Sequence, residues 1–295
     1  MISKLKRLHI ITWGGIGDVI LLTPTLREIK KLSPRIAVTV HAINSKHYEV
    51  LLHNPYIDAL RLEPKVRLFC INLFRNYLPK RYQRPVYGAF APSVWLPKQH
   101  ATKVIAELLG VELSDSTSDL FLTPEEEEFG RATTSCLKTP IAIHVRSSTV
   151  NKEWPLKFWR ELIARNPQYD FIQLGTSSEP RLEGTVNITE GRLRPQFAIL
   201  KYCKAFIGVD SCFAHVTNAF HIPGVVLFGA STAEVWGHPN NINLSTGLRC
   251  SPCIDMIQPF KCPYGVECLE MLPIEQVEET LKKQLSANVM EIGLR

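Results

Sequence analysis

The sequence predicts an α/β protein of two Rossmann-like domains that face each other across a cleft. Short apolar runs alternate with amphipathic stretches along the chain, which is typical of βα units and parallel sheets. The alternation stops at residues 122–140 and then starts again, so we expect one domain over residues 1–128 and a second over residues 129–295. A glycine-rich bend follows the first apolar run, where α/β folds often bind ligands.

Composition and charge indicate a globular protein with an anionic partner. The 295 residues are 45% hydrophobic and 21% charged, which is enough apolar material to bury a core. The net charge of +6 suits a phosphorylated substrate, a membrane surface or nucleic acid, without choosing among them. Basic residues precede the first apolar run, but glycines interrupt it and no small-residue cleavage site follows. With no apolar stretch of ~20 residues to span a bilayer, we expect a cytoplasmic protein.

The first half begins with two predicted strands, at residues 8–12 and 37–43, that flank a helix. Residues 25–33 have helical spacing and place three apolar side chains on one face: Leu26, Ile29 and Leu32. Two starting points for this helix fit the sequence. It begins near Asp18 and kinks at Pro24, or it begins with Pro24 in its first position behind a threonine cap.

The segment 122–140 has the composition of a boundary between domains. Thr123 and Pro124 predict the start of a helix, and the four glutamates that follow predict a solvated face with no chemical role. The second half then repeats strand and helix in regular order. We expect strands at 141–145, 170–175, 205–209 and 224–229, and helices at 155–166, 194–204 and 212–220. In the first of these helices, three side chains should point inward: Phe158, Leu162 and Ile163.

The glycine bend contains Gly14, Gly15, Gly17 and Asp18. A dinucleotide fingerprint would need a third glycine where Ile20 stands, and an acidic residue at the end of the second strand; neither is present. The Gly-Lys-Ser/Thr of a P-loop is also absent. What remains is a turn that brings backbone amides, those of Gly15 and Gly17 among them, and the Asp18 carboxylate to the carboxyl edge of the first strand.

The second half places polar residues just past the ends of three predicted strands. They are Ser147, Ser148, Thr149 and Lys152 after the first, Gly175 and Glu179 after the second, and Asp210, Ser211 and His215 after the third. Hydroxyls followed by a lysine suit a diphosphate, and a helix that starts at Ser211 offers free N–H groups to an anion. Glu179 suits a ribose hydroxyl. A helix cap, a packed histidine and a surface lysine would explain each residue alone, but their joint position just past three strands favours a site for a diphosphate and a ribose.

In order and spacing these motifs resemble the ADP-heptose:lipopolysaccharide heptosyltransferases, glycosyltransferase family 9, over nearly the whole chain. The matching segments are 14–31, 54–58, 144–162, 209–231 and the cysteine-rich segment 250–268. The resemblance implies the GT-B fold and an inverting transfer of heptose from ADP-heptose to a lipopolysaccharide core or related acceptor. It also implies that the chemical step needs no metal. The alternatives are another nucleotide sugar, a protein acceptor, or a non-catalytic protein that binds nucleotide sugars.

The resemblance also implies roles for individual residues. Asp18 corresponds to the base that takes the acceptor proton, and the loop with Ser147, Ser148, Thr149 and Lys152 binds the donor diphosphate. Glu179 binds the ribose, while Asp210, Ser211 and His215 contact phosphate and sugar. The family's usual glycine after Ser211 is Cys212 in this chain.

Two further segments suggest partners. Residues 61–84 are rich in Lys and Arg interleaved with aromatic residues, which favours an acidic acceptor or peripheral contact with the inner face of the inner membrane over nucleic acid. Four cysteines predict a structural zinc or iron site: Cys250, Cys253, Cys262 and Cys268. Two disulfides or four reduced thiols are the other interpretations. The remaining cysteines outside both motifs should be buried apolar residues: Cys70, Cys136 and Cys203.

Overall fold

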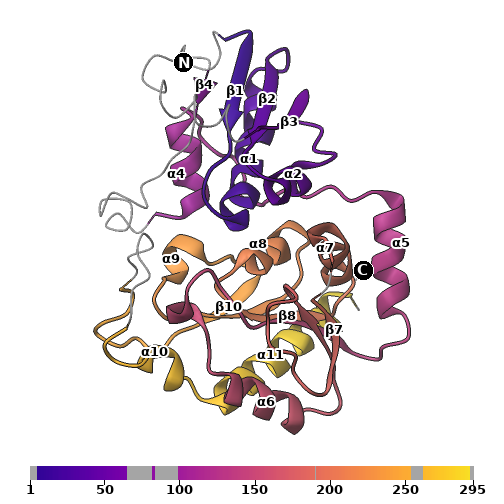
Figure 1. Ribbon diagram of the computed structural model, residues 1–295, viewed down its shortest axis with the longest axis vertical. Helices are drawn as coiled ribbons and strands as arrows, with labels where there is room; N and C mark the ends of the chain where they lie inside the picture. The colour runs from indigo at the N-terminus through magenta and orange to yellow at the C-terminus, as the bar shows by residue number, and fades with distance from the viewer. Residues whose placement is uncertain (1–4, 65–81, 84–98, 190, 254–261, 293–295) are drawn as a thin grey trace. The chain divides into compact units, whose positions relative to one another are not determined.

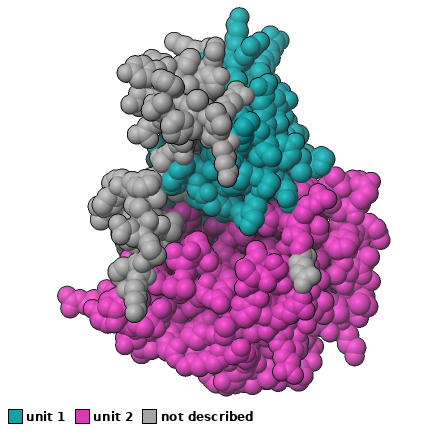
Figure 2. Space-filling model, in the orientation of Figure 1, with its two compact units in different colours: residues 1–121 teal, residues 122–295 magenta. Residues whose placement is uncertain are grey.

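The computed structural model describes residues 5–64, 82–83, 99–189, 191–253 and 262–292. The chain divides into two compact units, Met1–Phe121 and Leu122–Arg295 (Figure 2). The expected boundary at residue 128 lies inside helix α5 (Pro124–Thr134), which belongs to the second unit because it packs against α7 (Leu193–Lys201).

The first unit is built on a parallel sheet with strand order β3-β2-β1-β4. Its strands are β1 (Arg7–Ile11), β2 (Ala37–Ala42), β3 (Ala59–Leu62) and β4 (Tyr82–Gln83). Its helices are α1 (Ile16–Leu32), α2 (Ser45–Leu51) and α4 (Ala101–Leu108). Leu8, Ile10 and Val40 of the central strands are fully buried, which fits short apolar runs in a sheet covered by helices.

The observed start of helix α1 decides between the two predicted starts of the first helix. It starts at Ile16, with Gly15 at the N-cap, and Pro24 lies inside it. The earlier of the two predicted starts is therefore right. Leu26 and Ile29 are fully buried as predicted, but Leu32 is 61% exposed because it is the last residue of the helix.

Charged contacts fix α1 to its neighbours within the first unit. The Lys30 ammonium lies 2.6 Å from Asp58 Oδ2, which also accepts the backbone N–H of Val38 at 2.6 Å. The buried Arg27 guanidinium donates to the Asp119 carboxylate at 2.6 Å. Asp58 ends the matching segment 54–58, so this motif has a structural role here.

The second unit contains a larger parallel sheet with strand order β10-β9-β8-β5-β6-β7. Its strands are β5 (Pro140–His144), β6 (Asp170–Leu174), β7 (Thr185–Ile188), β8 (Ala205–Val209), β9 (Gly224–Leu227) and β10 (Asn241–Leu244). The order reverses between β5 and β8, the two central strands. In such doubly wound sheets, ligands bind at the carboxyl ends of the strands next to this switch point.

Helices cover both faces of this sheet: α7 and α8 (Cys212–Ala219) lie on one, α6 (Leu156–Arg165) and α11 (Ile274–Ile292) on the other (Figure 1). The remaining helices described are α9 (Ala233–Trp236), α10 (Glu267–Glu270) and the 3-10 turn η4 (Val150–Lys152). In α6 the predicted Leu162 and Ile163 are buried, but Trp159 is buried more fully than Phe158.

The predicted helix start at Thr123 and Pro124 is confirmed, but the glutamates after it are not all solvated. Thr123 caps α5, and the Glu126 carboxylate accepts the Thr123 N–H at 2.9 Å. Glu126 also accepts from Arg194 Nε of α7 at 2.6 Å, and Glu127 lies 2.5 Å from Lys201 Nζ. The acidic run thus holds α5 on α7.

Candidate functional site

Polar side chains of the second unit meet at the switch point between β5 and β8. Lys152 Nζ lies 2.7 Å from Asp210 Oδ2, and both side chains are buried. The Ser147 hydroxyl, past the end of β5, donates to the Asp210 carbonyl at 2.7 Å. The loop predicted to bind a diphosphate and the residues after β8 are therefore joined directly.

Lys152 and Asp210 form a buried ion pair at this edge of the sheet. Burial alone would raise the pKa of Asp210, but the charges of Lys152 and His215 more than offset it and lower the pKa below its ordinary value. His215 Nδ1 lies 2.8 Å from His238 Nε2, and both rings are buried. Lys152 is thus in contact with a carboxylate, in a buried position rather than on the surface.

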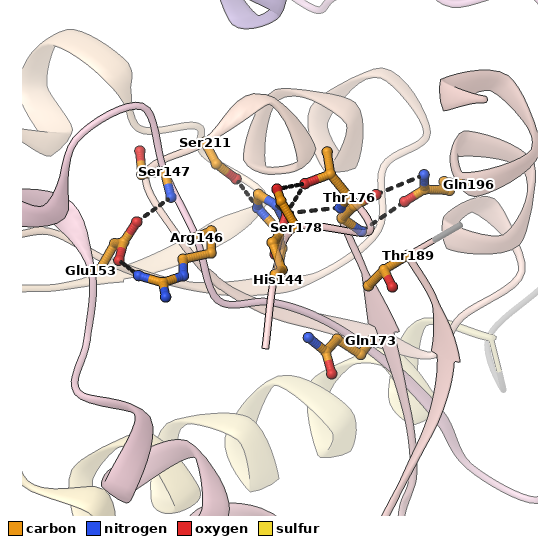
Figure 3. Close-up of polar contacts among 12 residues, drawn as sticks. His144, Arg146, Ser147, Glu153, Gln173, Thr176, Ser178, Thr189, Gln196 and Ser211 are labelled. Carbon is orange, nitrogen blue, oxygen red and sulfur yellow. Dashed lines mark hydrogen bonds and ion pairs between the residues drawn. The ribbon is translucent and has the colours of Figure 1, made fainter. Parts of the chain in front are cut away.

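His144, the last residue of β5, connects two other predicted site residues (Figure 3). Its Nδ1 lies 2.8 Å from the Ser211 hydroxyl oxygen, and its Nε2 lies 3.5 Å from Glu179 Oε1. Burial tends to raise the pKa of Glu179, but the hydrogen bond and charge of His144 and the N–H of Thr176 lower it overall. Glu179 is therefore an anion at neutral pH.

The loop after β6 holds Glu179 through several contacts. Gly175 has φ of 144°, and a Cβ there would lie 2.4 Å from Glu179 Oε1. The Gln196 amide binds both sides of the same glycine: its Oε1 accepts from Gly175 N at 2.7 Å, and its Nε2 donates to Gly175 O at 3.0 Å (Figure 3). The buried Gln173 Nε2 donates to the Pro180 carbonyl at 2.9 Å.

The loop after β5 is shaped by Glu153. Its carboxylate accepts from Arg146 through a short hydrogen bond and from the Ser147 backbone N–H at 3.2 Å. Ser148 is exposed, and Thr149 lies at the N-cap of η4, where its carbonyl accepts from Lys152 N at 3.1 Å. The loop therefore exposes hydroxyls and a half-exposed guanidinium at the edge of the sheet.

In the first unit, the glycine bend folds around Asp18. Asp18 Oδ2 accepts the Gly15 N–H at 2.5 Å, and Gly14 has φ of 78° with no room for a Cβ beside that carboxylate. Gly17 and Asp18 both lie in the first turn of α1, half-buried. The carboxylate predicted to be the base thus also caps its own helix.

A buried histidine supports this bend from below. His47 of α2 places Nδ1 2.9 Å from the Thr12 hydroxyl, and it is 1% exposed. Burial lowers the pKa of His47 to about 4, although a hydrogen bond to the Gly14 backbone opposes the shift. The ring is therefore neutral at pH 7.

Sequence patterns missed several of these residues. His144, Gln173, Gln196 and His238 were not singled out, since each is an isolated polar residue in an apolar or loop segment. His144 offered one usable signal: it is a lone histidine near the carboxyl end of a buried strand. Asp18, Gly15 and Gly17 lie in the first unit, and the other predicted nucleotide-sugar residues lie in the second.

The structure describes residues 250–253 and 262–268 of the cysteine-rich segment, and residues 254–261 lie outside the described part of the chain. Cys250 and Cys253 are exposed, Cys262 is half-buried and Cys268 is buried. Burial, and then the neighbouring cysteines 253, 250 and 262, raise the pKa of Cys268 to about 11. Among the residues described, no three His, Cys, Asp or Glu side chains are grouped to hold a metal ion.

Of the other cysteines, Cys203 is buried as predicted, but Cys136 is exposed because it follows the end of α5; Cys70 lies outside the described residues. Most of the basic stretch 61–84 also lies outside them. No helix in the described part of the chain combines the length and apolar character needed to cross a bilayer.

Comparisons with known proteins point to one family. The model of glycosyltransferase family 9 (heptosyltransferase) matches residues 98–263, more than half of the chain. The chain is 24% identical to lipopolysaccharide heptosyltransferase 1 of Pseudomonas aeruginosa over 198 residues, 61% of this chain and 53% of that relative. The match therefore spans about half the length of the curated relative.

Solved structures show the same fold. A family 9 glycosyltransferase from Veillonella parvula superimposes with a TM-score of 0.74 at 19% identity, over 97% of this chain and 99% of that one. TibC of enterotoxigenic E. coli, an iron-containing dodecameric heptosyltransferase solved in complex with ADP-D-β-D-heptose, gives a TM-score of 0.70 at 16% identity. That match covers 96% of this chain and 77% of TibC. These neighbours are GT-B glycosyltransferases, which confirms the predicted fold class.

Proposed function

The chain belongs to glycosyltransferase family 9, the heptosyltransferases, and from this premise we propose that it transfers heptose from ADP-heptose to a lipopolysaccharide core or related acceptor. The observation that carries the proposal is the group of polar residues at the switch point of the second unit. Ser147, Ser211 and Glu179 follow three strands. Ser147 donates to the Asp210 carbonyl next to Ser211, and His144 contacts both Ser211 and Glu179. Such hydroxyls can donate to the oxygens of a diphosphate, and a carboxylate can accept from the hydroxyls of a ribose.

In this proposal the second unit binds the donor. The hydroxyls of Ser148 and Thr149 and the N–H groups of the first turn of α8 donate to the diphosphate. The Ser147 hydroxyl donates to the Asp210 carbonyl and holds this loop beside the end of β8. Lys152, Arg146 and His215 supply positive charge as the diphosphate leaves, which stabilises the developing negative charge. Glu179, ionised at neutral pH, accepts from the ribose hydroxyls.

The first unit supplies the base. Inverting transfer requires a group that takes the acceptor proton while the bond between C1 of the sugar and the diphosphate breaks. Asp18 has a half-buried carboxylate on a fixed helix turn and is proposed for this role. Proton transfer to a carboxylate and charge stabilisation by fixed donors suffice for the step, so it is proposed to need no metal.

We place this reaction in the cytoplasm, with the acceptor presented at the inner face of the inner membrane. The net charge of +6 supports an anionic glycolipid acceptor. A structural zinc or iron held by Cys250, Cys253, Cys262 and Cys268 is also proposed. Its support is the spacing of the four cysteines in the sequence. Such an ion would hold the segment in place and take no part in transfer.

The test is direct. Purified protein is screened for thermal stabilisation by nucleotide sugars, since a ligand at 100 times its Kd stabilises by about 2.7 kcal/mol. We expect ADP-heptose to raise the Tm more than UDP- or GDP-sugars do. Transfer is then followed with labelled donor and heptose-deficient lipopolysaccharide. Binding without product would favour a non-catalytic protein, and preference for another nucleotide would refute the ADP-heptose donor.

A further inference from the structure

His144 is a buried histidine to which neither the sequence motifs nor the proposed mechanism assigns a role. It is 7% exposed and ends β5, one of the two strands at the switch point. Its ring packs against Phe213 at a steep angle, with 4.7 Å between ring centroids, so one contact of the ring is apolar. Both ring nitrogens then face polar groups, one on each side.

The two contacts go to separate parts of the site. On one side the Nδ1 faces Ser211, the N-cap of α8, at 2.8 Å. On the other side the Nε2 faces Glu179, in the loop after β6, at 3.5 Å. Figure 3 shows the Ser211 hydroxyl directed at the ring. No other described contact joins Ser211 to Glu179.

Hydrogen positions make this link more than a packing contact. If Nδ1 accepts from Ser211, the serine hydroxyl hydrogen is used there, and the oxygen can offer a ligand only lone pairs. If Nδ1 donates instead, the serine hydroxyl hydrogen is free for a phosphate oxygen. The ring therefore decides whether Ser211 can act as a donor to an anion, while its other nitrogen holds the Glu179 carboxylate.

We propose that His144 is the positioning residue of the donor site, a single ring that orients the phosphate-side hydroxyl of Ser211 and the ribose-side carboxylate of Glu179 together. The inference rests on the proposed function, since it assumes that this edge binds a nucleoside diphosphate. It assigns His144 no direct contact with the ligand.

Two amide variants test the contacts of the two ring nitrogens separately. Asn at position 144 keeps a polar atom where Nδ1 lies, so His144→Asn retains the contact with Ser211 and loses that with Glu179. His144→Gln places its amide where Nε2 lies and does the reverse. His221→Asn, at an exposed histidine of the same unit, is the matched control.

The probes are ADP and 2′,3′-dideoxy-ADP, measured by calorimetry on the full chain. We expect both His144 variants to weaken ADP binding about 10-fold, with parent-like binding in His221→Asn. The dideoxy analogue should bind the parent and His144→Gln more weakly than ADP does. In His144→Asn this preference should largely disappear, because the carboxylate that reads the ribose has lost its support.

Parent-like affinity in both variants, or an unchanged ribose preference in His144→Asn, would overturn the positioning role and leave the proposed function intact. A parent that binds no ADP would overturn both. A second measurement leaves His144 unchanged. It compares the ADP affinities of Ser211→Ala, Glu179→Gln and the double variant. If the ring couples the two residues, their losses in ADP affinity are not additive, whereas independent contacts would add.

Discussion

At the scale of single residues, Asp18 and Glu179 are held by the same device. Each carboxylate folds back over a glycine four positions earlier, Gly14 or Gly175, at a φ that favours glycine. Each also accepts a backbone N–H from the residue after that glycine, at 2.5 Å in the first unit and 2.8 Å in the second. The position of either carboxylate thus depends on a missing Cβ.

Gly175→Ala tests this dependence. An added Cβ would lie 2.4 Å from Glu179 Oε1, so the carboxylate must move. We expect ADP affinity to fall at least about 10-fold, because a charged hydrogen bond to the ribose is lost. Gly191→Ala is the control, with φ of 128° and open space around the added methyl. Equal effects of the two substitutions on ADP affinity would show that backbone strain, rather than Glu179, is responsible.

Lys152 requires a different test, because it is paired with the buried Asp210. Lys152→Ala leaves a buried carboxylate without its cation and should cost about 3–5 kcal/mol of stability at pH 7. The parent pKa of Asp210 is lowered, so the pair stabilises the fold above the ordinary value of 3.8 and loses this effect as pH falls through the folded pKa. The difference between parent and variant in urea unfolding should therefore shrink below pH 3.8, as the pH falls through the lowered pKa of Asp210 in the folded parent.

A double variant provides the control for that experiment. Lys152→Met with Asp210→Asn removes both charges, and it should recover much of the stability lost in Lys152→Ala. If Lys152→Ala unfolds like the parent at pH 7, the ion pair is unimportant for the fold. Loss of ADP binding in that variant would then report on the diphosphate directly.

At the scale of elements, α5 is attached to the second unit by charge. Glu126 meets the buried Arg194 and closes the cap of its own helix, whereas Glu128 pairs with Arg131 at the surface. Glu126→Gln should lower the free energy of unfolding by about 1.5–3 kcal/mol. Glu128→Gln should change it by no more than about 0.5 kcal/mol. Similar values for both in urea unfolding would contradict this role of α5.

The cysteine-rich segment gives a second test at this scale. The proposed structural ion predicts close to one zinc or iron per chain in protein purified without added metal. The ion should be absent from a Cys250→Ser, Cys253→Ser variant, and the Tm of this variant should be lower. Cys136 is an exposed cysteine just after α5, so the Cys136→Ser variant should retain the ion. Elemental analysis and thermal unfolding measure both. Metal-free protein with full thermal stability would instead identify the segment as four reduced thiols.

At the scale of the whole molecule, the proposed functions are divided between the units. The proposed base, Asp18, lies in the first unit, and the residues proposed to bind the donor lie in the second. Asp18→Asn should therefore leave ADP affinity unchanged and cut kcat by at least ~100-fold. Asparagine can still accept the Gly15 N–H, so the Tm should change little. Near-parental turnover in this variant would exclude Asp18 as the base.

The sequence alone determined the fold class, and it predicted that polar residues gather at one edge of the second sheet. Apolar runs of strand length, separated by amphipathic stretches, specify βα units because parallel strands must be covered on both faces. Polar residues after such strands fall at one edge of the sheet, so Ser147, Glu179 and Ser211 could be predicted as a group. Thr123 and Pro124 likewise marked the start of α5, because capping is local in sequence.

The tertiary structure decided which partner each of these side chains meets. Lys152 contacts Asp210, 58 positions away, and His144 contacts Ser211 and Glu179, 67 and 35 positions away. No sequence pattern specifies a pair at such separations. The glutamates of α5 looked solvated until α7 brought Arg194 and Lys201 beside them. Periodicity records which residues are buried, but the contacts of a buried polar group depend on strand order, and that order is set by packing of the whole sheet.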